Sequence, residues 1–187
     1  MSTRRRHILI AALAPTLASA PACALAETTT AIPVEVANEL PGASLRGQGR
    51  LNVLLMHVYD IRLWSPMPFT PETFTRVPLA LEIEYARRLV GRLIAERSIE
   101  EMHRQQPLAD TQRERWLALM RQAFPDVDAG DRITGVQRPG EAARFFVNGA
   151  YRAEIRDAEF TRLFFGIWLA PQSSQPRLRE QLLGLSS

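Results

Sequence analysis

The stretch from Ala129 to Leu185 constrains the fold more than any other part of the chain, because its turns and periodicities follow one another without a gap. Two runs rich in β-branched and aromatic residues flank Asn148-Gly149, a dipeptide that tolerates the positive φ angles of a tight hairpin. A helix is predicted to begin at Asp157 and to end before Pro171. Its apolar positions recur at helical spacing: Phe160, Leu163, Phe164 and Ile167. This block therefore predicts a hairpin followed by a helix and a shorter closing helix.

Upstream of this block, period-2 and helical patterns alternate. Residues 45–64 predict one long strand, or two strands with a bend. The first half of this segment is expected to be covered on both faces of the sheet, and the second half on one face only. Residues 79–85 predict a half-buried strand. A helix that ends at Pro107 follows, and a second helix is predicted to begin at the capping-box sequence Thr111-x-x-Glu114.

The remaining elements are strands near 132–137, 142–148 and 150–156 and helices near 158–169 and 176–183. The resulting order is β-β-α-α-β-β-β-α-α. Strands grouped in this way predict an α+β fold with a mainly antiparallel sheet.

Residues 1–26 have the pattern of a cleavable export signal. Arg4–Arg6 precede an apolar run over Ile8–Leu17, and Ala24-Leu25-Ala26 matches the small-x-small pattern of a cleavage site. The run is too short, and too interrupted by proline, to span a bilayer as a helix. We therefore expect cleavage after Ala26, a periplasmic location and one domain over residues 27–187. The paired arginines are compatible with ordinary secretion and with twin-arginine export.

The charge of the mature chain differs from that of the whole. All 23 basic residues are arginine, and three of them lie in the export signal, whereas all 20 acidic residues follow it. The mature chain is therefore formally neutral, which argues against a nucleic-acid partner, since binding to phosphates needs a net positive face. The single cysteine also lies in the signal, so no disulfide or cysteine-based metal site is expected after it.

Motifs for catalysis and for metal binding are missing. The chain has no G-x-S-x-G sequence, and His57 and His103 lack the H-E-x-x-H spacing of a zinc site. The acidic loop 126–131 lacks the ligand spacing of a calcium loop, and Gly47-x-Gly49 lacks the βαβ context of a dinucleotide site. We therefore assign no catalytic residue, no metal ligand and no cofactor.

Arg50 is the candidate for binding an anionic group, because it lies beside a glycine pair at the start of an apolar strand. Its planar guanidinium can hold a carboxylate through two parallel hydrogen bonds. Tyr59 and Tyr85, on strands that are expected to be neighbours, are predicted to line the same cavity. The alternative is an ion pair of Arg50 with a nearby acid such as Glu82 or Glu84, and plain packing of the tyrosines.

These elements together resemble the chalcone isomerase-like proteins of bacteria. The matching pieces are Gly47-x-Gly49-Arg50, Val58-Tyr59-x-x-x-Leu63-Trp64, the strand 79–85 with its helix, Gly130-Asp131-x-Ile133, Asn148-Gly149, Phe160-x-x-x-Phe164-x-x-Ile167-Trp168-Leu169 and Leu182-Leu183-Gly184. Their order and spacing carry the resemblance. It implies an open-faced β-sandwich, in which a large antiparallel sheet has a layer of helices on one face and any ligand lies between the two.

The resemblance also implies a site. In the plant enzymes of the superfamily, which close a chalcone to a flavanone, the site is lined by an arginine, a tyrosine, an asparagine and threonines. Arg50 best matches that arginine, with Arg46 as its competitor. Residues 93–102, which should carry the tyrosine and the asparagine, contain neither, and no threonine matches on the long strand.

Superfamily relatives that lack this chemistry bind fatty acids, and their arginine is thought to meet the carboxylate. We therefore expect an exported, non-catalytic protein that binds an apolar carboxylate such as a fatty acid. One alternative is an isomerase or intramolecular lyase on another substrate, with a polar cluster such as Arg50, His57 and Tyr59. The other alternative is an envelope protein-interaction module.

Overall fold

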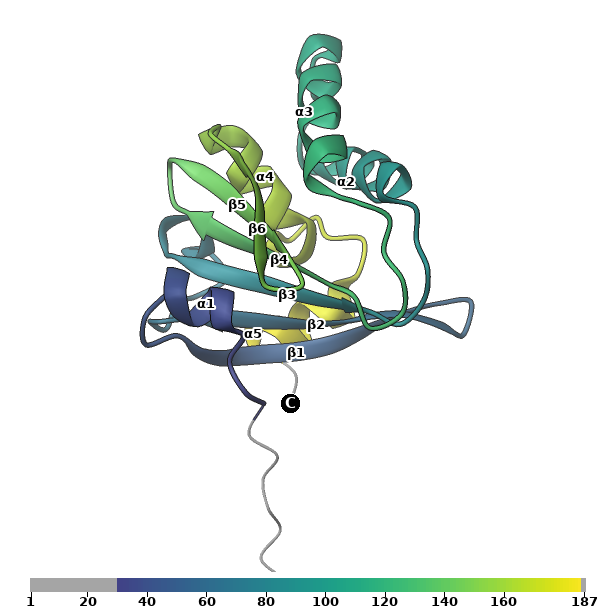
Figure 1. Ribbon diagram of the computed structural model, residues 1–187. Coiled ribbons are helices and arrows are strands. Elements are labelled where there is room, and N and C mark those ends of the chain that lie inside the picture. The colour runs from purple at the N-terminus through teal and green to yellow at the C-terminus, as the bar shows by residue number, and fades with distance from the viewer. Residues whose placement is uncertain (1–29, 186–187) are drawn as a thin grey trace, which may run out of the picture.

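A six-stranded antiparallel sheet, with its strands in chain order from β1 to β6, organises the molecule (Figure 1). The computed structural model describes residues 30–185, so the expected export signal, residues 1–26, lies outside the described residues. The strands are β1 Ser44–Val53, β2 Met56–Ser65, β3 Leu79–Tyr85, β4 Arg132–Arg138, β5 Ala142–Val147 and β6 Ala150–Ile155. The helices are α1 Val34–Glu39, the 3-10 helix η1 Phe74–Arg76, α2 Gly91–Gln105, α3 Asp110–Ala123, α4 Ala158–Leu169 and α5 Pro176–Leu183.

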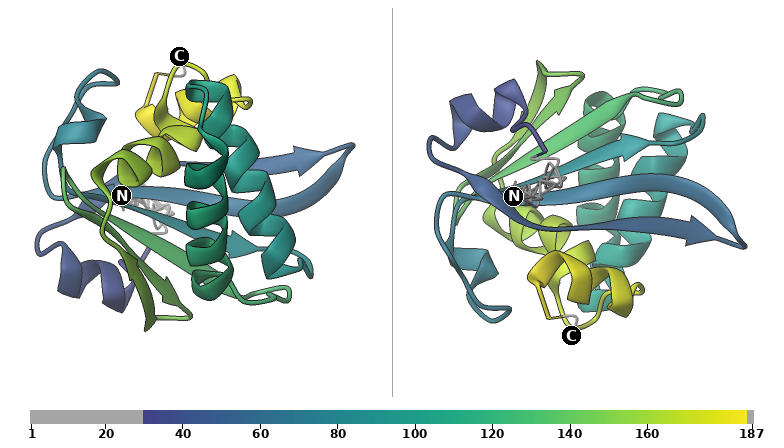
Figure 2. Two further views of the ribbon diagram at one scale, coloured as in Figure 1. Left: turned by 90° about the horizontal axis from the view of Figure 1, so that it is seen from above. Right: turned by 90° about the horizontal axis from the view of Figure 1, so that it is seen from below.

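The helices cover the two faces of the sheet unequally. Helices α2 to α5 lie on one face and enclose the main apolar core, as the views in Figures 1 and 2 show. The short helix α1 lies on the other face, where it covers a smaller apolar cluster of strand residues. We call these the inner face and the outer face. The arrangement confirms the predicted α+β fold with a helical layer on one side of an antiparallel sheet.

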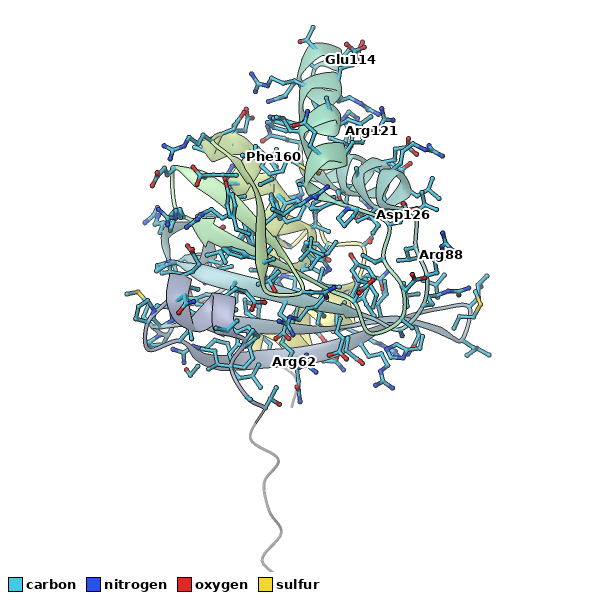
Figure 3. The ribbon with its side chains drawn as sticks, viewed as in Figure 1. Arg62, Arg88, Glu114, Arg121, Asp126 and Phe160 are labelled. Atoms are coloured by element: carbon cyan, nitrogen blue, oxygen red, sulfur yellow. The ribbon has the colours of Figure 1, made fainter. Side chains whose placement is uncertain are left out.

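The closing block of the chain folds as its sequence predicts. Asn148 and Gly149 have φ angles of 50° and 85° and join β5 to β6 in a two-residue turn. The Asp157 carboxylate accepts hydrogen bonds from the backbone N–H groups of Glu159 and Phe160 and so caps α4. Phe160, labelled in Figure 3, is fully buried on the inner side of that helix.

Helix α5 packs against the edge strand β1 at the glycine pair. A Cβ atom at Gly47 would lie 2.3 Å from the Leu182 carbonyl oxygen, and one at Gly49 would lie 2.4 Å from Leu178 Cδ1. At Gly47 the close atoms are backbone and only glycine leaves room for the helix, whereas at Gly49 they are the ends of side chains that can shift. The glycine pair, which is part of the family resemblance, therefore has a packing role.

Three local predictions differ from the structure. Helix α3 begins at Asp110 after Ala109, with no side-chain cap, so the capping box at Thr111 is not formed. Strand β3 is buried on both faces rather than one, because α1 and its apolar cluster cover the outer side. Helix α1 itself was not predicted, since six residues after Pro33 carry too little periodicity.

The segment 45–64 differs most. It forms two strands, as one of the two alternatives expected, but a tight turn at Leu54-Leu55 joins them instead of a bend, and they pair with each other. Its burial is also the reverse of the prediction, because residues 53–56 are exposed whereas Ile61, Leu63 and Trp64 are buried. An apolar run that looks like a core strand is here the projecting end of a hairpin.

Candidate ligand-binding site

Tyr59 and Tyr85 lie opposite each other on the neighbouring strands β2 and β3. Their ring centroids are 6.2 Å apart and the rings meet edge to face. Both rings pack against the main core on the inner face, and the strands that carry them are neighbours, as expected from the sequence.

The two hydroxyl groups differ in their hydrogen bonds. Tyr59 Oη accepts a hydrogen bond of 2.9 Å from the indole Nε1 of Trp168, in the last turn of α4. The Tyr85 hydroxyl makes no hydrogen bond with any residue in the range 30–185, although Tyr85 is only 4% exposed. The Tyr85 oxygen is not one of the fully buried polar atoms without a partner in the same range, so it keeps some accessible surface. Those atoms are Arg46 Nε, His57 Nε2, Gln137 Oε1 and Arg144 Nε.

Burial keeps both tyrosines protonated. Desolvation raises the pKa of Tyr59 to about 12, against the opposing effect of the hydrogen bond from Trp168. Desolvation also raises the pKa of Tyr85, and the neighbouring Tyr59 adds to that rise. At neutral pH the pair therefore offers hydrogen-bond donors rather than bases.

A buried carboxylate on α2 lies near this pair. Glu101 is 5% exposed and is bound by Arg97 and by the Ser174 hydroxyl, which donates a hydrogen bond of 2.9 Å. The negative charge of Glu101 raises the pKa of Tyr59 and the positive charge of Arg97 lowers it, so both groups are close enough to act on the site. Sequence reasoning missed Glu101 and Trp168.

Signals for both residues were present in the sequence. Glu101 lies between Ser98 and Met102 on the buried side of α2, where a carboxylate is unusual. Trp168 follows Phe164 by four residues along the apolar stripe of α4, at its end nearest the tyrosines.

Arg50 lies on the outer face, away from the tyrosines. Its Nε and Nη2 atoms are 2.7 and 3.3 Å from the two carboxylate oxygens of Asp60, its partner on β2, and its side chain is 57% exposed. Burial alone would raise the pKa of Asp60, but the hydrogen bond and charge of Arg50, together with His57, lower it. Arg50 thus has an acidic partner, as the alternative interpretation expected, but the partner is Asp60.

Glu82 and Glu84 bind a different arginine. Arg62 Nη1 lies 3.1 Å from an oxygen of each carboxylate. Arg62 is labelled in Figure 3, on the β1–β2 side of the sheet. The structure therefore brings Tyr59 and Tyr85 together and separates Arg50 from them by the thickness of the sheet.

An open pocket of about 390 Å³ lies at Arg50. It is lined by Gln48, Gly49, Arg50, Asp60, Ile61, Arg62 and Gln181. A second open pocket lies at the start of α3 and is lined by Ala109, Thr111, Gln112 and Arg115. Both are open to the surface.

The two histidines differ in their contacts. His57 Nε2 lies 3.3 Å from Asp60 Oδ1, but this buried atom forms no hydrogen bond within the described residues. His103 Nδ1 accepts a hydrogen bond of 3.0 Å from the backbone N–H of Leu108, in the loop after α2. Over residues 30–185, no three His, Cys, Asp or Glu side chains are grouped as metal ligands would be. None of the helices in the same range is long and apolar enough to cross a bilayer.

Comparison with known proteins decides the family. The chalcone isomerase-like family matches residues 27–184, which is most of the chain. This protein belongs to the chalcone isomerase-like family. The family assignment confirms the resemblance seen in the sequence.

One known protein is similar to this chain in sequence, and another is similar in structure. An uncharacterized protein of Haemophilus influenzae is 34% identical over 128 residues, which are 68% of this chain and 61% of that protein. The chain thus spans about three fifths of that relative's length. The crystal structure of a fatty-acid binding protein of Arabidopsis thaliana aligns with a TM-score of 0.59 at 12% identity, over 76% of this chain and 87% of that one. At this identity the likeness establishes a shared chalcone isomerase-like fold.

Proposed function

We propose that this chalcone isomerase-like protein is exported and binds an apolar carboxylate, such as a fatty acid, between its sheet and its inner helices without altering it. The observation that carries the proposal is the Tyr85 hydroxyl, which belongs to a core residue of the inner face and forms no hydrogen bond with the described residues. A ligand carboxylate that accepts a hydrogen bond from Tyr85 would satisfy it. Hydrogen bonds to a charged acceptor are the stronger kind.

The surroundings of the tyrosines suit such a ligand. Apolar and aromatic side chains from the strands and from α4 line the layer, and a few placed donors among apolar walls are typical of small-molecule sites. The fatty-acid binding protein of Arabidopsis thaliana, which shares the fold, supports the choice of ligand class. Entry requires a helix to move, because Tyr85 and the core residues around it are buried.

Helix α2 is the element best suited to move. It packs mainly on α3 and α4 rather than directly on the strands. Val90 and Leu93, at its start, expose apolar side chains on the outside of the layer, with 40% and 51% of their surface accessible. Outward displacement of α2 would open a path lined by apolar groups to Tyr59 and Tyr85.

The protonation of the tyrosines supports binding over catalysis. An isomerase or intramolecular lyase needs a group that accepts a proton at working pH. Tyr59 and Tyr85 have raised pKa values and stay protonated, and the Arg50–Asp60–His57 group lies on the outer face of the sheet. The cluster of Arg50, His57 and Tyr59 that an enzyme would use is thus divided between two faces.

A second position for the carboxylate is the open pocket at Arg50. There the guanidinium groups of Arg50 and Arg62 flank Asp60, and a ligand anion would have to displace Asp60 from Arg50. This position keeps the anion clamp expected from the sequence, but it places the ligand outside the layer.

The test measures fatty-acid binding to protein purified after expression of the full chain. Native mass spectrometry and lipid extraction would identify any bound fatty acid, and palmitate titration would give the affinity. We expect Tyr85→Phe to weaken binding about tenfold or more, the factor that one lost hydrogen bond to a charged group gives. Tyr151→Phe is the matched control, because Tyr151 is exposed on β6.

Arg50→Ala distinguishes the two positions. We expect the Arg50→Ala variant to bind palmitate like the wild type. If Arg50→Ala instead lowered the affinity tenfold and Tyr85→Phe left it unchanged, the carboxylate would be assigned to the outer pocket. A wild type that carries no fatty acid and does not bind palmitate would refute the proposed function. For export, sequencing of the periplasmic protein should give Glu27 as the first residue, and recovery of an unprocessed chain from the cytoplasm would contradict it.

A further inference from the structure

The hairpin of β1 and β2 projects beyond the rest of the molecule, as Figure 1 and both views in Figure 2 show. Four consecutive apolar residues form its end: Val53, Leu54, Leu55 and Met56. Their side chains and backbone are 45%, 88%, 100% and 48% exposed, respectively. We call these four residues the hairpin tip. Single exposed leucines are ordinary, but four adjacent apolar residues on a projection are not.

The backbone of the tip makes its composition more unusual. Leu54 and Leu55 have φ angles of 47° and 67°, in the left-handed region that disfavours residues with a branched or bulky side chain. The β5–β6 hairpin has the same two-residue turn, with φ angles of 50° and 85°, and there the chain uses Asn148-Gly149. That dipeptide is the one that such turns favour.

Folding therefore gives no reason for leucine at either turn position. Each leucine adds backbone strain, and neither buries its side chain against the protein. A residue pair that opposes local stability and gains no packing is expected where the pair serves an interaction.

The outer half of the hairpin itself carries no negative charge. No acidic residue occurs between Ser44 and Tyr59, so the outer half of the hairpin carries only cationic and neutral side chains. Arg87, in the loop after β3, lies with Nη1 3.2 Å from Met56 Sδ. Arg88, labelled in Figure 3 beside the hairpin, is exposed, and its Nε atom is 4.0 Å from a carboxylate oxygen of Asp128. Arg50 is paired with Asp60 further down the hairpin.

We propose that the hairpin tip docks this protein on a membrane surface that contains anionic phospholipids. Leu54 and Leu55 would enter the boundary between headgroups and acyl chains, and Arg87 and Arg88 would meet the phosphates. The proposal does not depend on the fatty-acid site, which lies between the sheet and the helices.

A membrane suits the tip better than a protein partner does. A stable protein–protein interface buries about 1,200–2,000 Å² in total and uses roughly 20–30 residues on each side. Four residues at the end of a narrow projection offer only a fraction of that area. A lipid surface receives a small convex apolar group without needing a matching concave surface.

The decisive variant is Leu54→Asn with Leu55→Gly, which gives the tip the turn sequence of the other hairpin. We expect protein with this double change to be at least as resistant to heat as the wild type, because the turn strain is relieved. We expect its binding to vesicles to fall about tenfold or more, since two apolar side chains no longer enter the lipid. The double change is thus expected to maintain or raise thermal stability while it lowers the affinity for vesicles.

The measurement is sedimentation of protein, purified after expression of the full chain, with two kinds of vesicle. One is pure phosphatidylcholine, and the other is an equal mixture of phosphatidylcholine and phosphatidylglycerol. We expect the wild type to prefer the anionic vesicles and to lose that preference in high salt. Arg87→Gln and Arg88→Gln should each weaken binding to the anionic vesicles about fivefold. Leu55→Trp supplies a direct probe, because its emission should shift to shorter wavelength only with vesicles.

Three outcomes would overturn the proposal. The wild type does not sediment with the anionic vesicles, or the double variant sediments as well as the wild type. Alternatively, light scattering shows that the double variant loses a dimer that the wild type forms, which would make the tip a contact between two copies. Palmitate binding is measured on the same samples, so a failure of either proposal is seen separately.

Discussion

The two faces of the sheet hold their covering elements by different means. On the inner face, a continuous layer of aliphatic and aromatic side chains joins the strands to α2, α3, α4 and α5. On the outer face, arginines and carboxylates pair across strands and with α1: Arg50–Asp60, Arg62–Glu82, Arg132–Glu35 and Arg144–Glu39. One face is stabilised mainly by burial of apolar surface, and the other combines ion pairs with a small apolar cluster.

The difference shows where function can be sought. Arg50, Arg62, Arg132 and Arg144 have carboxylate partners within the fold, so their presence is explained without a ligand. The inner face is apolar, and a polar group there stands out against its surroundings. Tyr85 is such a group, because its hydroxyl has no partner in the described part of the chain. An unsatisfied donor in an apolar layer is a better guide to a site than an arginine on an exposed strand.

The largest expected effect compares two adjacent residues of β5 that point to opposite faces. Phe145 is fully buried on the inner face against Phe124 and Phe164, at centroid distances of 5.2 and 5.1 Å. Phe145→Ala should cost about 3–5 kcal/mol in the free energy of unfolding, because the inner core cannot close around the cavity. Phe146→Ala on the outer face should cost about half as much, since α1 can shift inward. Denaturant unfolding at constant m-value measures both, and an equal loss would show that the faces are equally rigid.

The second effect tests the ion pairs of the outer face. The Glu35 side chain is fully buried and accepts hydrogen bonds from Arg132 and from the Thr134 hydroxyl, at 2.7 Å in the latter case. Glu35→Ala should cost about 3 kcal/mol, because Arg132 and Thr134 lose their partner and α1 loses its anchor. Arg50→Ala, which breaks an exposed pair, should give no measurable change and serves as the control. Unchanged denaturant midpoints for Glu35→Ala would mean that α1 is held by its apolar contacts alone.

The closing block was predictable because its signals are local. Asn148-Gly149 fixes a turn, Asp157 caps a helix, and the spacing from Phe160 onward selects its buried side, all within a few residues. Helix α1 was not predictable in this way. Its buried Glu35 meets Arg132, 97 residues further along the chain, so the helix depends on tertiary contacts.

The candidate site was predictable in part. The alternation that places Leu51 and Tyr59 on one face already places Arg50 on the other, but it does not say which face the helices cover. The turn at Leu54-Leu55 could not be found from turn chemistry, because its residues are those that such turns avoid. The hairpin tip and the outward position of Arg50 therefore needed the structure.

The third effect uses pH to examine the inner face separately. The chain has no lysine, so its three tyrosines are the side chains that titrate between the ordinary tyrosine pKa of 10 and the Tyr59 value of about 12. In that range an unfolded chain releases the tyrosine protons and the folded chain keeps those of Tyr59 and Tyr85. Stability should therefore be fully present below pH 10 and fall as the pH rises, by up to about 1.4 kcal/mol per pH unit for each group. Denaturant midpoints across this range measure the slope, and Tyr59→Phe should reduce it. A slope that Tyr59→Phe leaves unchanged would contradict the raised pKa.

The smallest effect separates the two tyrosines of the site. Tyr59→Phe should cost about 1 kcal/mol, because the Trp168 N–H loses its acceptor and stays buried without a partner. Tyr85→Phe should be neutral or should stabilise the protein by up to about 1 kcal/mol, because it removes a hydroxyl of a core residue that forms no hydrogen bond within the described residues. Thermal unfolding of the two variants beside the wild type measures the difference. If Tyr85→Phe destabilised the protein as much as Tyr59→Phe does, the Tyr85 hydroxyl would have a hydrogen-bond partner within the protein. This result would contradict its role as a donor to a ligand. If Tyr85→Phe is stable and binds palmitate weakly, the hydroxyl opposes folding and favours the ligand, as expected of a group retained for binding.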